Sequence, residues 1–262
     1  MADRLRPQDT EIVNQIRAFE DQYCLTQNFK LYRNYHVPES LVKKSKNVIS
    51  FGVGGDANFE KLICFDNQDL DVRMYDPTPY TVKNIGRILA KGGFRQFSQY
   101  ENAEQLNKKV IQDNLKFKPY AYAPMNGTLK FYYRSEEGNP TAEESLRSFS
   151  LVGPFDDPNK FVEVECKNIR SIMEELSWTH IDILKTDVEG LWYDVGKEIQ
   201  ELDVKFWVTE IEMNLGTTYE QAFDKVRELV DLHKQKYNIY VNRKRLKAMM
   251  EIIFYRKDID ES

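Results

Sequence analysis

A chain of 262 residues with 41% hydrophobic and 30% charged side chains can bury a large core and has the composition of a folded globular protein. Its formal net charge of −5 argues against a general nucleic-acid-binding surface, which needs clustered Lys and Arg. No apolar run approaches the ~20 residues that cross a bilayer, and the charged first residues lack the apolar region of a signal peptide. We therefore expect a cytoplasmic protein without a membrane span.

The three cysteines, Cys24, Cys64 and Cys166, lie far apart in the sequence and show no C-x-x-C spacing. This pattern predicts neither a disulfide framework nor a zinc site. We expect all three to be buried, reduced thiols.

Residues 1–46 contain no glycine and are predicted to form an N-terminal helical extension before one α/β domain at residues 47–262. Apolar side chains recur at helical spacing from Ile12 to Tyr23, and an aromatic-rich connection follows. The extension either covers a ligand or pads the core. Aromatic side chains at helical spacing favour padding.

The first informative segment, residues 47–60, is predicted to be a strand, a glycine turn and the start of a helix, with Asp56 at the N-cap position. Gly52 and Gly54 allow a sharp bend that exposes N–H groups near the positive end of the helix, which favours an anionic ligand group. Residues 52–57 also satisfy the pattern G-x-G-x-x-G/A. Many α/β proteins share that pattern, so an ordinary strand-to-helix turn is the alternative.

A second predicted strand begins at Asp71 and ends in Asp76, before a helix with Thr78 as N-cap and Pro79 at its first position. Asp76 follows Gly52 by 24 positions, close to the ~20 at which an acid reaches the ribose hydroxyls in βαβ nucleoside sites. The two features together indicate a nucleoside ligand better than either alone.

The middle of the chain is predicted to form a flap at the sheet edge. Residues 115–122 read as a third strand, and Asn126-Gly127 predicts a hairpin turn into a strand at residues 128–133. Residues 134–160 are polar and lack an apolar period. We interpret them as a substrate lid, with a floppy insertion as the alternative.

Two further predicted strands end in charged residues. Residues 180–190 carry Lys185, Asp187 and Glu189 at the strand end, and Glu210 and Glu212 share one face of the next strand because they differ by two. Ligands of open α/β sheets bind outside the carboxyl ends of the strands, where these side chains would converge with the glycine turn. A salt bridge at a strand end is the alternative role for Glu210.

The C-terminal part is predicted to be a helix opened by a capping box, Thr218 with Gln221, followed by a strand pair at residues 238–242 and 248–255. The basic connection at residues 243–247 is interpreted as a solvated loop, with a phosphate-bearing substrate as the sharper alternative.

This order of elements, with the motifs at residues 51–56, 75–79 and 181–190 and a weaker one at residues 126–131, resembles the FkbM family of class I S-adenosylmethionine-dependent methyltransferases. The resemblance extends from about residue 48 to residue 213. It implies a Rossmann-like sheet of seven strands with the last antiparallel, helices on both faces, and S-adenosylmethionine as cofactor. It also implies O-methylation, often of a sugar hydroxyl. We predict that the acceptor is a hydroxyl of a sugar, sugar nucleotide or glycan.

The resemblance also implies cofactor-binding roles for the first two motifs. Gly52 and Gly54 would pass close to the methionyl part of the cofactor, with Asp56 in the same motif. Asp76, with Pro77 beside it, would bind the ribose diol.

The same resemblance places Tyr122 and Ala123 near adenine. Lys185, Asp187 and Glu189 would border the amino-acid end of the cofactor and the reacting methyl group.

For methyl transfer the protein must place a hydroxyl in line with the sulfonium and remove its proton, for which a carboxylate suffices. Glu189 is the first candidate for general base, and Glu210 and Asp187 are the next. No metal ligand is assigned. Mg²⁺ held by Asp187, Glu189 and Glu210 would suit hard oxygen ligands, but the spacing does not require it.

Two other functions stay open at this point. Tyr193 and Lys197 form a Tyr-x-x-x-Lys pattern that resembles a short-chain NAD(P)-dependent oxidoreductase, although Gly196 between them weakens the helix. A nucleoside-binding domain without catalysis is the other, because a motif match does not show turnover.

Overall fold

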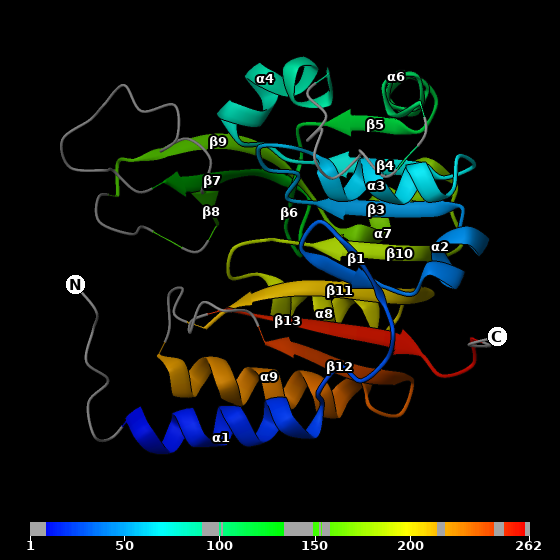
Figure 1. Ribbon diagram of the computed structural model, residues 1–262. Helices are drawn as coiled ribbons and strands as arrows, with labels where there is room; N and C mark the ends of the chain where they lie inside the picture. The colour runs from blue at the N-terminus through cyan, green and yellow to red at the C-terminus, as the bar shows by residue number, and fades with distance from the viewer. Residues whose placement is uncertain are drawn as a thin grey trace.

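The computed structural model describes residues 9–90, 100, 102–133, 149–151, 153, 158–213, 218–243 and 249–259. Its centre is a seven-stranded sheet of order β12-β13-β11-β10-β3-β4-β5, in which β13 runs antiparallel to the other six strands (Figure 1). The seven-stranded prediction with the last strand antiparallel is therefore confirmed. The strands are β3 (Asn47–Phe51), β4 (Asp71–Tyr75), β5 (Leu115–Lys118), β10 (Ile181–Thr186), β11 (Val204–Glu212), β12 (Tyr237–Arg243) and β13 (Met249–Arg256).

Helices cover both faces of this sheet, because its central strands are apolar on both sides. Ile183 of β10 belongs to a buried cluster with α2, α3, α4 and α6, whereas the next residue, Leu184, belongs to a second cluster with α1, α7, α8 and α9. The helices are α1 (Asp9–Gln22), α2 (Glu39–Lys44), α3 (Asn58–Asp66), α4 (Pro79–Ala90), α6 (Ala103–Asp113), α7 (Ile169–Leu176), α8 (Trp192–Ile199) and α9 (Tyr219–His233). None of those in the described ranges is long and apolar enough to span a membrane.

The N-terminal helix is present as α1 and packs beside α9, where the rings of Phe19 and Phe223 are 5.4 Å apart (Figure 1). This contact is the core padding that the aromatic spacing predicts. The connection after it also forms a small hairpin that the sequence does not predict, β1 (Lys30–Tyr32) with β2 (Tyr35–Val37). Cys24, at the end of α1, is exposed, so the prediction of three buried thiols is wrong for it; Cys64 and Cys166 are buried.

The predicted hairpin at Asn126-Gly127 is wrong. Its two arms, β6 (Ala121–Tyr122) and β7 (Gly127–Tyr133), both pair with β9 (Phe161–Lys167), which lies between them, and β8 (Phe149–Ser150) completes a separate sheet of order β6-β9-β7-β8. Asn126 does not close a turn, because its Oδ1 accepts from the N–H of Asn168 at 3.1 Å. Pro119, which has no N–H, separates β6 from β5. Figure 1 shows this second sheet beside the ends of β3 and β4.

The local signals at helix starts are largely confirmed. α9 begins with the predicted capping box of Thr218 and Gln221. α3 begins one residue later than predicted, after Ala57 in the left-handed region, and Asp56 Oδ1 accepts from the N–H of Asn58 at 2.9 Å. The predicted lid falls mostly outside the described residues, since residues 134–148, 152 and 154–157 are not among them.

Candidate functional site

A pocket of about 600 Å³, including its open mouth, lies at the carboxyl ends of β3, β4 and β10. Parallel strands bring their ends together at this edge, as the sequence predicts. The predicted site residues that line it are Gly52, Gly54, Asp76, Pro77, Tyr122, Asp187 and Glu189. Asp56, Ala123, Lys185 and Glu210 are not among the lining residues.

The two glycines of the loop after β3 have different tasks, although both have positive φ, 73° at Gly52 and 66° at Gly54. A Cβ on Gly52 would lie 2.2 Å from the backbone oxygen of Asp187, so glycine is required there for the close approach of the β10 end. A Cβ on Gly54 would meet no atom within 4 Å, so Gly54 leaves the pocket open.

The N–H groups of these glycines are not exposed for an anion, in contrast to the sequence-based expectation. Gly52 N donates to Tyr75 O at 3.0 Å, and Gly54 N donates to Asp76 Oδ2 at 2.8 Å. Neighbouring backbone and a side chain therefore satisfy the donors that the turn creates.

Asp76 joins the glycine loop to the end of β4. Its Oδ1 accepts from the N–H and the hydroxyl of Thr78, at 2.9 and 2.6 Å, while Oδ2 accepts from Gly54. Burial raises the pKa of Asp76, and these hydrogen bonds oppose that rise. The carboxylate is thus fixed in orientation at the pocket wall.

Lys185 stabilises the glycine loop after β3 through hydrogen bonds to backbone carbonyl oxygens. Its Nζ donates to the carbonyl oxygens of Phe51, at 3.1 Å, and Gly52, and lies 5.0 Å from the centre of the Tyr35 ring. Asp56 lies on the surface, paired with Arg33 at 3.1 Å.

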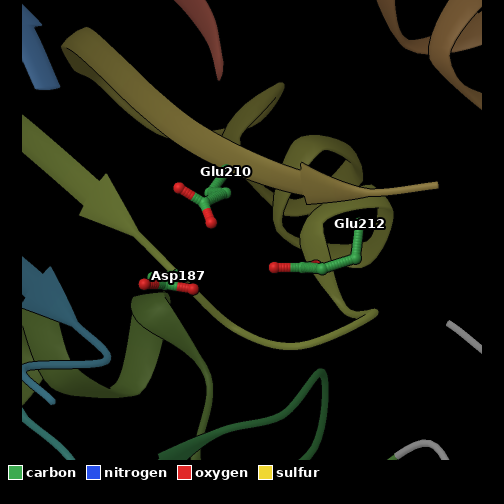
Figure 2. Close-up of side chains that lie close together, drawn as sticks. All are labelled: Asp187, Glu210 and Glu212. Carbon is green, nitrogen blue, oxygen red and sulfur yellow. The ribbon is translucent and has the colours of Figure 1, made fainter. Parts of the chain in front are cut away.

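Three carboxylates meet beside the pocket where β10 and β11 end. Asp187, Glu210 and Glu212 each bring one oxygen within 4.8 Å of the others, and Figure 2 shows the three groups facing a common space. Glu210 and Glu212 reach it together because two-residue spacing puts both on one face of β11. Tyr35 Oη donates to Asp187 Oδ2 at 3.1 Å and so holds it in place.

Glu212 is the member of this acidic cluster that extends furthest along β11. It is 8% exposed, and its Oε2 has no hydrogen-bond partner among the described residues. Burial, followed by the nearby charges of Glu189 and Asp187, raises the pKa of Glu212 well above its usual range. The sequence places Glu212 correctly on the strand, but its unsatisfied oxygen becomes visible only in three dimensions.

Several residues at or beside the pocket are not predicted from the sequence as site residues. Phe131 and Leu151 come from the second sheet, whose pairing the sequence does not predict. Tyr35 is 152 positions from Asp187 and belongs to the unpredicted hairpin. In contrast, Tyr193 and Lys197 both lie on α8 and neither lines the pocket, so the dehydrogenase-like pattern is not part of the site.

A comparison with protein families identifies the family of the chain. The Methyltransferase FkbM domain matches residues 28–239, well over half of the chain. No curated protein matches the chain. Similar solved structures include an O-methyltransferase from Bacillus cereus in complex with SAH, 8% identical over 97% of this chain and 94% of that one, with a TM-score of 0.41.

The METTL16 methyltransferase domain is 10% identical over 97% of this chain and 84% of its own, with a TM-score of 0.41. Precorrin-6y C5,15-methyltransferase from Geobacter metallireducens is 11% identical over 91% and 96%, with a TM-score of 0.37. Likenesses at this level carry no functional conclusion, and the family is shown by the domain match. The chain belongs to the FkbM methyltransferase family and is an S-adenosylmethionine-dependent methyltransferase.

Proposed function

We propose that the protein transfers a methyl group from S-adenosylmethionine to a hydroxyl oxygen of a sugar, sugar nucleotide or glycan. The observation that carries this proposal is the position of Glu189 and Asp187 on the wall of the same pocket that Asp76 and Gly54 line. A fixed ribose-binding acid and a proton acceptor thus share one cavity.

The pocket residues fit an adenosine-containing cofactor. Asp76 accepts three hydrogen bonds from the protein, which leaves room for a ribose hydroxyl because a carboxylate offers about four acceptor positions. Tyr75 and Tyr120 stack with 15° between their rings, and Tyr120 and Tyr122 give the wall an aromatic surface suited to a nucleobase. When bound, S-adenosylmethionine supplies an electrophilic methyl group on a good leaving group.

Glu189 is our first choice for the general base. It lies in the loop between β10 and α8 on the pocket wall, and its carbonyl oxygen accepts from Ser150 Oγ at 2.6 Å. This bond links the loop to the second sheet. Asp187 is the second choice, since Tyr35 already donates to it, and Glu210 is the third because it does not line the pocket.

The acceptor would enter between the acids and the second sheet. Phe131 and Leu151 line that side, and Ser150 bridges it to the Glu189 loop. Aromatic and apolar walls beside carboxylates match the mixed surface of a sugar, whose ring faces are apolar and whose hydroxyls are hydrogen-bond donors. The net charge of −5 disfavours RNA as the acceptor.

The ribose assignment is tested by calorimetric binding of S-adenosylhomocysteine to wild type and to Asp76→Ala. Loss of the buried acceptor should weaken binding about 10- to 100-fold. Glu163→Gln, an exposed position on β9, is the control and should bind as wild type. Unchanged affinity in a folded Asp76→Ala variant would exclude Asp76 from the ribose site, and tight binding of NAD(P)H alone would exclude the cofactor.

The reaction is tested by a methyl-transfer screen over sugar nucleotides, small phenols and RNA. With the accepted substrate, Glu189→Gln should lower kcat about 10²- to 10⁴-fold while leaving S-adenosylhomocysteine affinity within about twofold, because only proton removal is lost. Transfer to RNA or to phenols alone would refute the sugar assignment. A Glu189→Gln variant with wild-type kcat would move the base to Asp187 or Glu210.

A further inference from the structure

The acidic cluster of Asp187, Glu210 and Glu212 has the composition of a site for a hard divalent cation. All three side chains offer carboxylate oxygens, the ligands that Mg²⁺ and Ca²⁺ prefer. Two oxygens on opposite sides of one ion are separated by twice the metal–oxygen bond length. This separation is ~4.2 Å for Mg²⁺ and ~4.8 Å for Ca²⁺. The three oxygens here lie within 4.8 Å of one another, which is within the span of one Ca²⁺-sized ion.

Spacing alone does not make such a site, since acidic groups often gather at strand ends without an ion. The second observation is Glu212, which is 8% exposed and whose Oε2 has no hydrogen-bond partner among the described residues. Figure 2 shows its carboxylate pointing into the space between Asp187 and Glu210. A buried carboxylate oxygen without a partner costs free energy unless something outside the chain satisfies it.

The surroundings hold the cluster ready for a ligand. Asp187 is oriented by the hydroxyl of Tyr35, and the backbone N–H of Asp187 donates to Phe51 O at 3.2 Å, which fixes the chain as it leaves β10. Glu210 and Glu212 project from one of the central strands of the sheet. Rigid elements therefore set all three ligand positions, and Asp187 also lines the pocket and so connects the cluster to it.

We propose that Asp187, Glu210 and Glu212 bind one hard divalent cation, of the Mg²⁺ or Ca²⁺ type, beside the pocket. This ligand set differs from the one that sequence spacing allows, because Glu212 replaces Glu189. Glu189 stays free of the ion and available as the base. The cation site does not depend on the identity of the methyl acceptor, since the carboxylates converge on it without any substrate.

The test is direct binding of Mn²⁺, followed by electron paramagnetic resonance of the free ion, to the full chain after treatment with a chelator. We expect one Mn²⁺ per chain, displaced by Mg²⁺. Glu212→Gln and Asp187→Asn should each weaken binding about tenfold or more, because each removes one charged ligand. Glu104→Gln, an exposed change of the same kind on α6, should leave affinity within about twofold.

Each variant is first checked for folding by circular dichroism and for S-adenosylhomocysteine binding, so that a lost ligand is separated from a lost fold. The proposal would be overturned if wild type bound no Mn²⁺ at millimolar concentration. It would also be overturned if a folded Glu212→Gln variant bound Mn²⁺ with the affinity of wild type. The assay contains no acceptor. Mn²⁺ binding without methyl transfer would therefore refute only the proposed acceptor, and transfer without Mn²⁺ binding would refute only the cation site.

Discussion

The parallel strands β10 and β11 carry buried acids in opposite electrostatic states at their two ends, Asp182 near the start of β10 and Glu212 at the end of β11. At the amino end, Asp182 accepts from the N–H groups of Lys46 and Asn47 at 2.7 and 2.9 Å, and from Lys205 Nζ at 2.6 Å. Burial alone would raise the pKa of Asp182, but these hydrogen bonds outweigh it and hold the pKa below its usual range. At the carboxyl end, burial and like charges raise the pKa of Glu212 well above its range.

The difference lies in the donors, since exposure is similar, 2% for Asp182 and 8% for Glu212. The chain surrounds Asp182 with its own N–H groups and a lysine, and this closes the amino end of the sheet. At the other end, Oε2 of Glu212 has no hydrogen-bond partner within the part of the chain that the structure describes. Two acids of comparable burial thus differ in their surroundings. Asp182 is satisfied by the chain itself, whereas Glu212 is the one proposed to bind a cation.

The largest effect is expected for Asp182→Asn, which removes the hydrogen-bonded carboxylate at the amino end of β10. The amide turns an NH₂ group toward existing donors and removes the charge that Lys205 pairs with, so the free energy of unfolding should fall by about 2–4 kcal/mol. Urea unfolding at pH 7 measures it. Asp69→Asn, an exposed change of the same kind, should stay within about 0.5 kcal/mol. A loss below about 1 kcal/mol for Asp182→Asn would show that the amino end does not depend on this carboxylate.

The difference in free energy of unfolding between wild type and Asp182→Asn should depend on pH. The folded pKa of Asp182 is lowered, so its carboxylate adds stability above its unfolded pKa of about 3.9, and that stability is lost as pH falls through the folded pKa. The gap in free energy of unfolding between wild type and Asp182→Asn should be constant from about pH 5 to 7 and shrink below about pH 4. A gap that does not change across this range would contradict the assignment.

Much of this fold is predictable because its signals are local. The glycine turn, the Asp76 turn and the capping box of Thr218 each lie within a few residues, and each marks the element boundary to within a residue. The second sheet is not predictable in this way, because β9 pairs with strands about 40 positions earlier in the sequence. A favourable turn dipeptide such as Asn126-Gly127 does not outweigh that long-range pairing.

The candidate site shows the same difference between local signals, which the sequence contains, and long-range contacts, which it does not show. Strand ends predict that Gly52, Asp76, Asp187 and Glu189 share a pocket, because parallel strands have one carboxyl edge. Sequence does not show whether a side chain at that edge points outward. Lys185 instead donates to the backbone of the glycine loop. The importance of Glu212 follows from its Oε2, which lacks a donor among the described residues.

A smaller effect of opposite sign is expected when the negative charge of Glu212, at the carboxyl end of β11, is removed. Glu212→Gln resembles the protonated carboxyl and removes like-charge repulsion, so in the presence of a chelator the free energy of unfolding should rise by about 1 kcal/mol near pH 8. Because the folded pKa of Glu212 is raised, wild type loses stability as pH rises above the unfolded pKa of about 4.3, and the variant should lack that loss. Chemical unfolding at pH 5 and 8 compares them. A destabilised variant would mean that Glu212 has a structural partner.

The smallest effect is expected for His180→Gln. His180 Nε2 lies 3.4 Å from Asp182 Oδ1, but the imidazole is 35% exposed and Asp182 keeps its closer donors, Lys205 at 2.6 Å and two backbone N–H groups. The change in free energy of unfolding should stay below about 0.5 kcal/mol at pH 7, as for other exposed pairs. Urea unfolding beside Asp182→Asn measures both on one scale. A loss above about 1 kcal/mol would show that the environment of Asp182 needs the imidazole as well as the backbone N–H groups. The contrast between the two ends of the β10–β11 pair would then depend on a side chain that is open to solvent.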